Sequence, residues 1–222
     1  MIWPTLVFDN FFTDPDKIVE ISKRYKYINE GSYPGVRTDY LHSIDYAFFN
    51  WSTLKILTLL YPTEVRHLKW QAHSHFQKVS ADLEFGWIHR DIPAEFTAII
   101  YLSKDEIGTS LFEPISPEIV TPDEVANVKY NFFKNTNISA EERSKVAEAK
   151  EKNNAKFRET LSIKGKYNRL VLFDSSHYHT AHVFKGSEPD VERLTHITFF
   201  DKIVLGDNKR NLKYPGSESR RI

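Results

Sequence analysis

Short apolar runs alternate with polar turns along the chain, and this pattern predicts several β-strands. Three runs, 96–102, 169–174 and 194–200, are rich in β-branched and aromatic residues and have the length of strands. Residues 68–77 alternate so that every second side chain lies on one face. His73 and His75 on that face are either cavity lining or half-buried strand residues. The spacing of the runs is typical of a β-sandwich or barrel.

Helical signals lie near the amino-terminal end. Thr13-Asp14-Pro15-Asp16 offers an N-cap candidate followed by proline and an acid in the first turn, which predicts a helix to about Tyr25. A second helix is expected from Ser52 to Leu60, with Pro62 beyond its end. We expect both helices to back the sheet.

Residues 121–161 form a charged insertion with two capping signals. Thr121-Pro122-Asp123-Glu124 predicts one helix through Phe132-Phe133. The capping box Ser139-Ala140-Glu141-Glu142 predicts a second helix to about Leu161. This helical hairpin is either a lid over a functional site or a solvated surface excursion.

The composition fits one sizeable domain. Hydrophobic residues make up 41% of the 222 residues, which is enough to fill a substantial core. Sandwiches and barrels of this length are common as single units. We therefore expect one domain over residues 1–206, including the insertion, and a C-terminal tail over residues 207–222.

Charge and residue usage restrict the partners. The formal net charge is zero, so a nucleic-acid partner has little electrostatic support. Cysteine is absent, which excludes disulfides and thiolate metal ligands. No apolar stretch of about 20 residues is long enough to span a bilayer, and the start of the chain lacks a signal-peptide pattern. We expect a cytoplasmic protein without membrane association, and no oligomeric state is predicted.

His89 and Asp91 are the candidate metal-binding pair. They lie just before the strand predicted at 96–102, and residues two apart in extended chain point to the same side, so both can reach one ion. A distal histidine, from the cluster His177-Tyr178-His179 or at His182, would complete the set. Two imidazoles and one carboxylate bind one face of a metal and leave positions open for ligand and oxygen.

At these residues the chain resembles the Fe(II)/2-oxoglutarate-dependent dioxygenases, and within them a prolyl-hydroxylase-like branch. The matching segments are His89-Arg90-Asp91, Ile100-Tyr101-Leu102-Ser103, Gly108-Thr109-Ser110-Leu111-Phe112, residues 168–176 leading to His179, and Arg193-Leu194-Thr195. Residues 8–15 and the segment Tyr33-Pro34-Gly35-Val36-Arg37 resemble the amino-terminal part of an uncharacterised bacterial and viral group of the superfamily. The resemblance reaches to about Lys202.

The resemblance implies a double-stranded β-helix, the jelly-roll form of the β-sandwich. The fold would be mainly β, with amino-terminal helices and the inserted hairpin. It also implies catalytic Fe(II) held by His89, Asp91 and His179, with His182 as the alternative distal ligand. Four further histidines would be hydrogen-bonded neighbours of the site or surface residues: His73, His75, His177 and His196.

Two further residues are implied to bind the cosubstrate, 2-oxoglutarate, which such enzymes use with O2. Arg193 would pair with the far carboxylate, because a guanidinium offers the planar fork that a carboxylate fits. Tyr101 matches a tyrosine that hydrogen-bonds the same carboxylate. Iron and cosubstrate carry the difficult chemistry, and the protein positions them.

The expected activity is hydroxylation of an aliphatic carbon in a small molecule or peptide, with a prolyl or other amino-acid residue as the nearest analogy. Asp91 argues against halogenation, because the halogenating members have a small residue there. Phe199 stands where nucleic-acid demethylases of the superfamily carry a second arginine. One alternative is a non-catalytic sugar-, peptide- or metal-binding jelly roll. Another is a metal-dependent cupin without a 2-oxo acid, which Arg193 disfavours.

Overall fold

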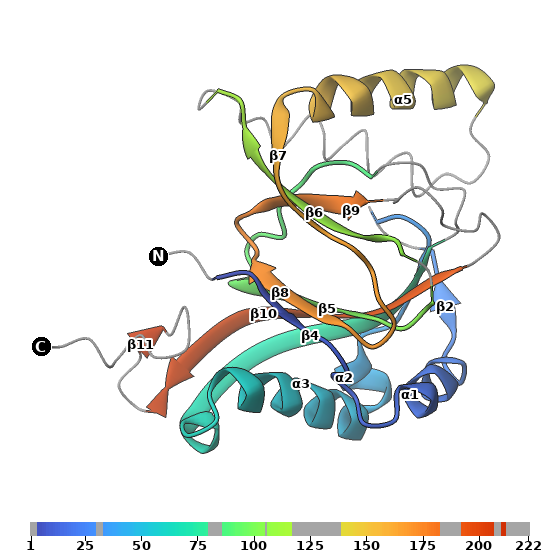
Figure 1. Ribbon diagram of the computed structural model, residues 1–222. Helices are drawn as coiled ribbons and strands as arrows, with labels where there is room; N and C mark the ends of the chain where they lie inside the picture. The colour runs from blue at the N-terminus through green and yellow to red at the C-terminus, as the bar shows by residue number, and fades with distance from the viewer. Residues whose placement is uncertain are drawn as a thin grey trace, which may run out of the picture.

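The computed structural model describes residues 4–29, 33–79, 86–104, 106–116, 139–182, 192–206 and 210–211. One large antiparallel sheet forms its centre (Figure 1). In order across this sheet the strands are β1 (Leu6–Phe8), β8 (Leu170–Asp174), β5 (Phe96–Tyr101), β10 (Arg193–Leu205), β4 (Leu68–Val79), β3 (Val36–Thr38) and β2 (Tyr27–Ile28), and β11 (Arg210–Asn211) pairs with β10.

A smaller antiparallel sheet packs on one face of the large one. It consists of β7 (Phe157–Ile163), β6 (Gly108–Pro114) and β9 (Tyr178–His182), in that order. The two sheets enclose a cluster of buried apolar side chains: Ala94, Ile99, Tyr101, Leu111, Ile163, Val171, Phe173, Ile197 and Phe199. We call the face of the large sheet that carries this cluster the inner face.

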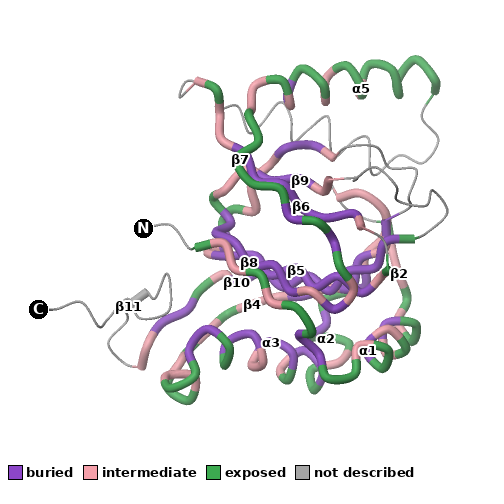
Figure 2. The backbone as a smooth tube through the Cα atoms, in the orientation of Figure 1, coloured by how far each residue is buried: buried purple, intermediate pink, exposed green. Residues whose placement is uncertain are grey.

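Helices cover the opposite face of the large sheet. They are α1 (Pro15–Ser22), α2 (Leu41–Ile44) and α3 (Tyr46–Leu60), and a short 3₁₀ turn, η1 (Val65–His67), follows (Figure 1). Along β5, Ala98 and Ile100 join the core beneath the helices, whereas Ile99 and Tyr101 face the smaller sheet. Because β5 is buried on both faces (Figure 2), all of its residues except Thr97 are apolar or aromatic. The predicted mainly β architecture with helices backing the sheet is confirmed.

Aspartate caps explain where α1 and α3 begin. The Asp14 carboxylate accepts from the Lys17 N–H at 3.0 Å, as expected for α1, which ends at Ser22 rather than Tyr25. The Asp45 carboxylate accepts from the Phe48 N–H at 2.9 Å, so α3 begins at Tyr46, six residues before the predicted start at Ser52. The Ser52 hydroxyl instead donates to the Phe49 carbonyl inside the helix.

The second predicted helix of the insertion is present but shorter than expected. It is α5 (Ala140–Asn154), and Ser139 and Glu142 form the predicted capping box. The predicted end at Leu161 is wrong, because residues 157–163 form β7 and pair with β6. Pairing along a sheet edge overrides the weak helical preference of this polar segment. The helix predicted through Phe132-Phe133 lies outside the described residues.

The strands predicted at 68–77, 96–102, 169–174 and 194–200 correspond to β4, β5, β8 and β10. The entire β10 strand is longer than its apolar run and continues past a register shift between Phe200 and Lys202. Among the described helices, none is both long enough and apolar enough to cross a membrane.

Candidate metal centre

The backbones of His89 and His179 are paired directly. The His89 N–H donates to the His179 carbonyl at 3.0 Å, and the His179 N–H donates to the His89 carbonyl at 2.8 Å. The Asp91 N–H donates to the Ser175 carbonyl at 3.0 Å. The His-x-Asp segment is therefore tied to the turn between β8 and β9 and to the start of β9, far away in the sequence.

This pairing gathers the side chains of His89, Asp91 and His179. One Asp91 oxygen lies 3.6 Å from Nε2 of His89, and the other lies 3.2 Å from Nε2 of His179. All three candidate donor atoms lie within 4.8 Å of one another. Neighbouring donors on one metal, at bonds of ~2.1 Å, are roughly 3 Å apart, so small side-chain adjustments would bring all three onto one ion.

His182, the alternative distal histidine, faces another set of groups. Its Nδ1 lies 2.6 Å from the Ser110 hydroxyl, 3.2 Å from the Ser162 hydroxyl and 3.3 Å from a Glu159 carboxylate oxygen. It is not part of the donor cluster. The geometry favours His179 as the distal ligand.

The imidazoles of His89 and His179 are oriented by backbone carbonyls. Nδ1 of His89 lies 2.7 Å from the Trp87 carbonyl, and Nδ1 of His179 lies 3.1 Å from the His177 carbonyl. A carbonyl can only accept, so each Nδ1 carries the proton in the neutral ring and each Nε2 presents a lone pair. Both Nε2 atoms face Asp91, which is the arrangement that metal ligation requires.

The Asp91 carboxylate is held in its charged form. The Thr97 hydroxyl donates to it at 2.9 Å, and Ser175 lies 2.8 Å from Thr97. Burial by itself would raise the pKa of Asp91, but positive charge on the neighbouring imidazoles, His179 first, and the Thr97 hydroxyl together hold it well below its usual range. A charged carboxylate and neutral imidazoles are the ligand states that a divalent cation needs.

The end of α5 holds the segment that precedes His89. The Asn154 side chain accepts from the Ile88 N–H at 3.0 Å and donates to the Gly86 carbonyl at 3.0 Å. Asn153 donates to the Ile88 carbonyl at 3.2 Å. The insertion thus contributes to positioning the first histidine, a role that the sequence did not indicate.

Arg193 and Tyr101 lie together on the inner face, as their predicted common role requires. The Arg193 guanidinium carbon is 5.3 Å from the centre of the Tyr101 ring, and the Tyr101 hydroxyl lies 2.7 Å from the Thr109 hydroxyl. Arg193 is buried, yet its Nε has no hydrogen-bond partner among the described residues. An orphaned buried guanidinium nitrogen is costly unless a ligand carboxylate completes it, so these residues fit the far end of a 2-oxo dicarboxylate.

An apolar wall separates the two ends of the site. Thr97, which binds Asp91, and Tyr101 are four residues apart on β5, roughly 13 Å along a strand. Ile99, Val171 and Ile197 of the inner-face cluster lie between these ends on β5, β8 and β10. The interval suits a short, extended ligand with a metal-binding group at one end and an anion at the other.

The histidines expected to be neighbours of the site or surface residues occupy different environments. His73 pairs with Asp201 at 3.0 Å, and Nδ1 of His75 lies 2.9 Å from the Thr38 carbonyl. His177 contributes its carbonyl to His179. His196 contradicts the expectation of a surface or site-neighbouring residue, because it is buried between Phe48 and Phe76 beneath the helices. Alternation along β10 places it on the face opposite Ile197.

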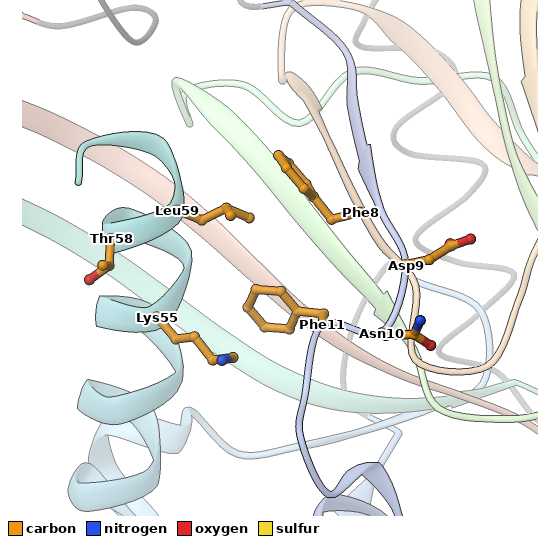
Figure 3. Close-up of a pocket in the computed structure, with 7 residues that line it drawn as sticks. All are labelled: Phe8, Asp9, Asn10, Phe11, Lys55, Thr58 and Leu59. Atoms are coloured by element: carbon orange, nitrogen blue, oxygen red, sulfur yellow. The ribbon is translucent and has the colours of Figure 1, made fainter.

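A surface hollow of about 470 Å³ lies on the helix side of the large sheet (Figure 3). It is lined by Phe8, Asp9, Asn10, Phe11, Lys55, Thr58 and Leu59. None of these residues belongs to the metal-ligand cluster or to the Arg193–Tyr101 pair. The hollow therefore has no part in the candidate centre.

Fold and donor cluster together define a jelly-roll protein with a His-x-Asp…His candidate metal centre. A model of the family of unknown function DUF6445 matches residues 3–200, and the chain belongs to this family. No curated protein matches the sequence.

Solved structures share the fold. HygX from Streptomyces hygroscopicus, with nickel and 2-oxoglutarate bound, is 11% identical with a TM-score of 0.51, over 89% of this chain and 82% of that chain. SnoN, a non-heme α-ketoglutarate-dependent epimerase of nogalamycin biosynthesis, is 11% identical with a TM-score of 0.51, over 97% and 86%. SnoK, a carbocyclase of the same biosynthesis, is 10% identical with a TM-score of 0.52, over 96% and 92%. These likenesses confirm the predicted double-stranded β-helix.

Proposed function

We propose that this protein is an Fe(II)- and 2-oxoglutarate-dependent oxygenase that hydroxylates an aliphatic carbon. The observation that carries the proposal is the placement of two complementary groups on one inner face. A cluster of two imidazoles and a carboxylate lies at one end, and a buried guanidinium with an orphaned Nε lies at the other. Fe(II), O2 and the 2-oxo acid together supply the oxidising chemistry when bound.

The residues of the chain have distinct roles in this proposal. His89, Asp91 and His179 hold the metal on one side and leave its other positions for ligands. Arg193 pairs with the far carboxylate of the cosubstrate. Burial raises the pKa of Tyr101, so its phenol stays protonated and can donate to the same carboxylate. The apolar wall between them excludes water from the reacting groups.

Hydroxylation is favoured over halogenation because the carboxylate of Asp91 occupies the position that a halide would need. The prolyl-hydroxylase-like branch is favoured by the motif match around His89-Arg90-Asp91 and Arg193-Leu194-Thr195. The fold by itself does not choose the reaction, since one jelly roll hosts many activities.

Calorimetry tests the proposal directly. Titration of 2-oxoglutarate into the Ni(II)-loaded protein should give one-site binding, and the metal-free protein should bind it far more weakly. The His179→Ala variant should lose this metal-dependent binding, whereas the matched His182→Ala variant should keep it. Equal 2-oxoglutarate binding with and without metal, or none in either state, would refute the proposal.

Succinate release separates an enzyme from a binding protein. With Fe(II), O2 and 2-oxoglutarate, an oxygenase of this class should release succinate slowly even without its primary substrate. A non-catalytic jelly roll would bind the dicarboxylate without consuming it. A cupin that uses no 2-oxo acid would do neither.

A further inference from the structure

We infer that the primary substrate is a carboxylic acid with an apolar body, and that Arg37 binds its carboxylate. This inference rests on the proposed function and adds the substrate class to it. Arg37 belongs to the Tyr33-Pro34-Gly35-Val36-Arg37 segment, to which neither metal nor cosubstrate binding assigns a role.

Strand register places Arg37 on the same inner face as the site. Arg37 on β3 pairs with Gln77 on β4, Gln77 pairs with Thr195 on β10, and Thr195 pairs with Tyr101 on β5. Side chains in register across neighbouring strands point to one face of a sheet. Arg37 therefore shares a face with Tyr101, but lies three strands away from it and outside the Arg193–Tyr101 pair.

The Arg37 side chain points along the sheet toward the metal end. Its guanidinium carbon lies 5.7 Å from the centre of the Phe199 ring, and Phe199 pairs with Thr97, the residue that binds Asp91. Burial lowers the pKa of Arg37, and the negative charge of Asp91 is the main influence that opposes this shift. The guanidinium is thus close enough to the metal cluster for one small molecule to contact both.

The turn before Arg37 is built to hold the guanidinium in place. The Gln77 side chain donates to the Pro34 carbonyl at 2.7 Å, and its oxygen accepts from Nε and Nη2 of Arg37 at 3.2 and 3.1 Å. Gly35 has φ +72, and a Cβ there would lie 2.0 Å from the Lys78 carbonyl oxygen. Only glycine permits this close approach, which brings the turn onto β4 and Arg37 beside Gln77.

Arg37 has no carboxylate partner among the described residues. Nε and Nη2 of its guanidinium both donate to the neutral amide oxygen of Gln77. Nearby acids are engaged elsewhere, since Asp201 pairs with His73 and Asp39 accepts from the Tyr40 N–H. Burial lowers the pKa of Arg37 to about 10, so the group remains cationic at neutral pH. A half-buried cation with an amide partner is ready for an anion.

Charge balance identifies the missing group as a single carboxylate. A divalent metal with Asp91, and a cosubstrate dianion with Arg193, sum to zero, which leaves the positive charge of Arg37 uncompensated. Burial lowers the pKa of His75 to about 4, so that imidazole adds no charge at neutral pH. Lys78 pairs with Glu192 at 3.0 Å. Since Arg37 contributes one positive charge, a monoanionic carboxylate matches it better than a phosphate dianion does.

Aromatic rings around Arg37 indicate an apolar body for the same molecule. The guanidinium lies 4.1 Å from the Tyr33 ring centre, and His73 stacks on Phe199 with ring centres 5.0 Å apart. Tyr40 contacts His75 with ring centres 4.8 Å apart. Such rings offer flat apolar surface beside the cation, which favours an acid with an aliphatic or aromatic side group over a sugar acid.

Matched acid and amide probes test this inference in the Ni(II)- and 2-oxoglutarate-loaded protein. The probes are N-acetyl-L-proline, N-acetyl-L-leucine and N-acetyl-L-phenylalanine, each compared with its primary amide by calorimetry. At least one acid should bind ~10-fold or more tightly than its amide, as one carboxylate–guanidinium pair predicts. If no acid is preferred, whether both forms bind or neither does, the inference is wrong.

Two substitutions of Arg37 assign the preference to this residue. Arg37→Gln and Arg37→Met both remove the charge, and the methionine keeps an apolar stem. The test uses the variant whose circular dichroism spectrum matches that of the parent protein. Either should abolish the acid preference, while Arg24→Gln, on the exposed end of the α1 turn, should retain it. A preference that survives the loss of the Arg37 charge would overturn the assignment.

The test separates this inference from the proposed function. The same calorimetry measures 2-oxoglutarate binding before any probe is added. If 2-oxoglutarate fails to bind with metal, the proposed function is wrong. The acid and amide probes, titrated into the metal-free protein, then still test whether Arg37 binds a carboxylate. If 2-oxoglutarate binds and no acid is preferred, only the substrate class is wrong.

Discussion

At the scale of single residues, the candidate metal centre depends on protons placed by the backbone. The Trp87 and His177 carbonyls place the proton of each neutral imidazole on Nδ1, and Thr97 restrains the carboxylate between them. The donors are thus ready for a cation before one arrives, which lowers the entropy lost on binding. The sequence pattern did not identify Trp87 or Thr97 as supporting groups, whereas His177 was expected to be a hydrogen-bonded neighbour of the site or a surface residue.

Asp91→Ala tests the centre at its single anionic donor. Removing the carboxylate should reduce succinate release from 2-oxoglutarate, without added substrate, to background. Even residues that only orient metal ligands cost ~10–100-fold when replaced, so a ligand should cost at least as much. His182→Ala, whose imidazole faces Ser110 and Ser162, serves as the control. Undiminished turnover by Asp91→Ala would mean that this carboxylate is not a ligand.

Arg193→Ala separates cosubstrate binding from metal binding. The variant should need far more 2-oxoglutarate, because loss of a desolvated charge partner costs on the order of 2–5 kcal/mol, or roughly 30- to 5,000-fold in affinity. Its Ni(II) affinity should change little, since Arg193 touches no donor in the cluster. Calorimetry with each ligand measures both constants. An equal loss of the two affinities would place the effect in the fold rather than in the carboxylate site.

At the scale of elements, the C-terminal end of α5 contacts the segment that precedes His89. Most of the helix is exposed (Figure 2), whereas Asn153 and Asn154 bind residues 86–88 just before His89. Of the two alternatives for the insertion, a lid or a solvated surface excursion, α5 resembles the second over most of its length. The helix is solvated along its length and anchors the first histidine at its end.

Asn154→Ala tests this anchoring. The variant loses one bond to the Ile88 N–H and one to the Gly86 carbonyl, so the free energy of unfolding should fall by about 1–3 kcal/mol. The Ni(II) affinity should fall ~10-fold, because His89 is less well oriented. Glu148→Ala, an exposed change on the same helix, should alter neither quantity. Unchanged metal affinity in Asn154→Ala would limit α5 to a stabilising role.

Elements with their own apolar run were predictable, and elements that depend on distant partners were not. The strands β5, β8 and β10 are rich in apolar and aromatic residues, and all of β5 and β8 and residues 193–200 of β10 are buried. The two- and three-residue strands β2 and β3 are too short for a pattern, and β7 takes its structure from β6. Arg37 remained without a role for the same reason, since its partner Gln77 lies forty residues away.

The metal-ligand cluster was predictable only in part. The two-residue spacing of His89 and Asp91 is local, so their common direction follows from extended backbone. The choice between His179 and His182 depends on the backbone pairing of His89 with His179, which exists only in the folded sheets. Chain spacing alone leaves both histidines on the same strand, β9.

At the scale of the whole molecule, acid should destabilise the fold through neutral buried histidines. Burial lowers the pKa of His75 to about 4 and of His196 to about 3, below the ordinary 6.5. The unfolded chain therefore binds these protons first as the pH falls below about 6.5, and stability falls with it. Each histidine contributes at most ~1.4 kcal/mol per pH unit.

His196→Leu should reduce this pH dependence. Neither ring nitrogen of His196 has a hydrogen-bond partner among the described residues, so leucine should also leave the protein as stable or slightly more stable at pH 7. Urea unfolding between pH 7 and pH 5, with chelator present, measures both effects. Asp9, whose pKa is lowered by Arg169 and Lys166, changes charge only below this range. A slope equal to that of the parent protein would exclude His196 as a source.

The reciprocal hydrogen bonds between His89 and His179 have a consequence for how metal choice can change. Because backbone atoms make this pairing, the two Cα positions do not depend on which side chains they carry. Either residue can therefore be replaced while the backbone pairing is kept. New donor atoms at these positions would alter which ion is accepted without requiring a new loop. In this fold the backbone therefore determines the position of the metal site, and the side chains determine which metal ion it binds.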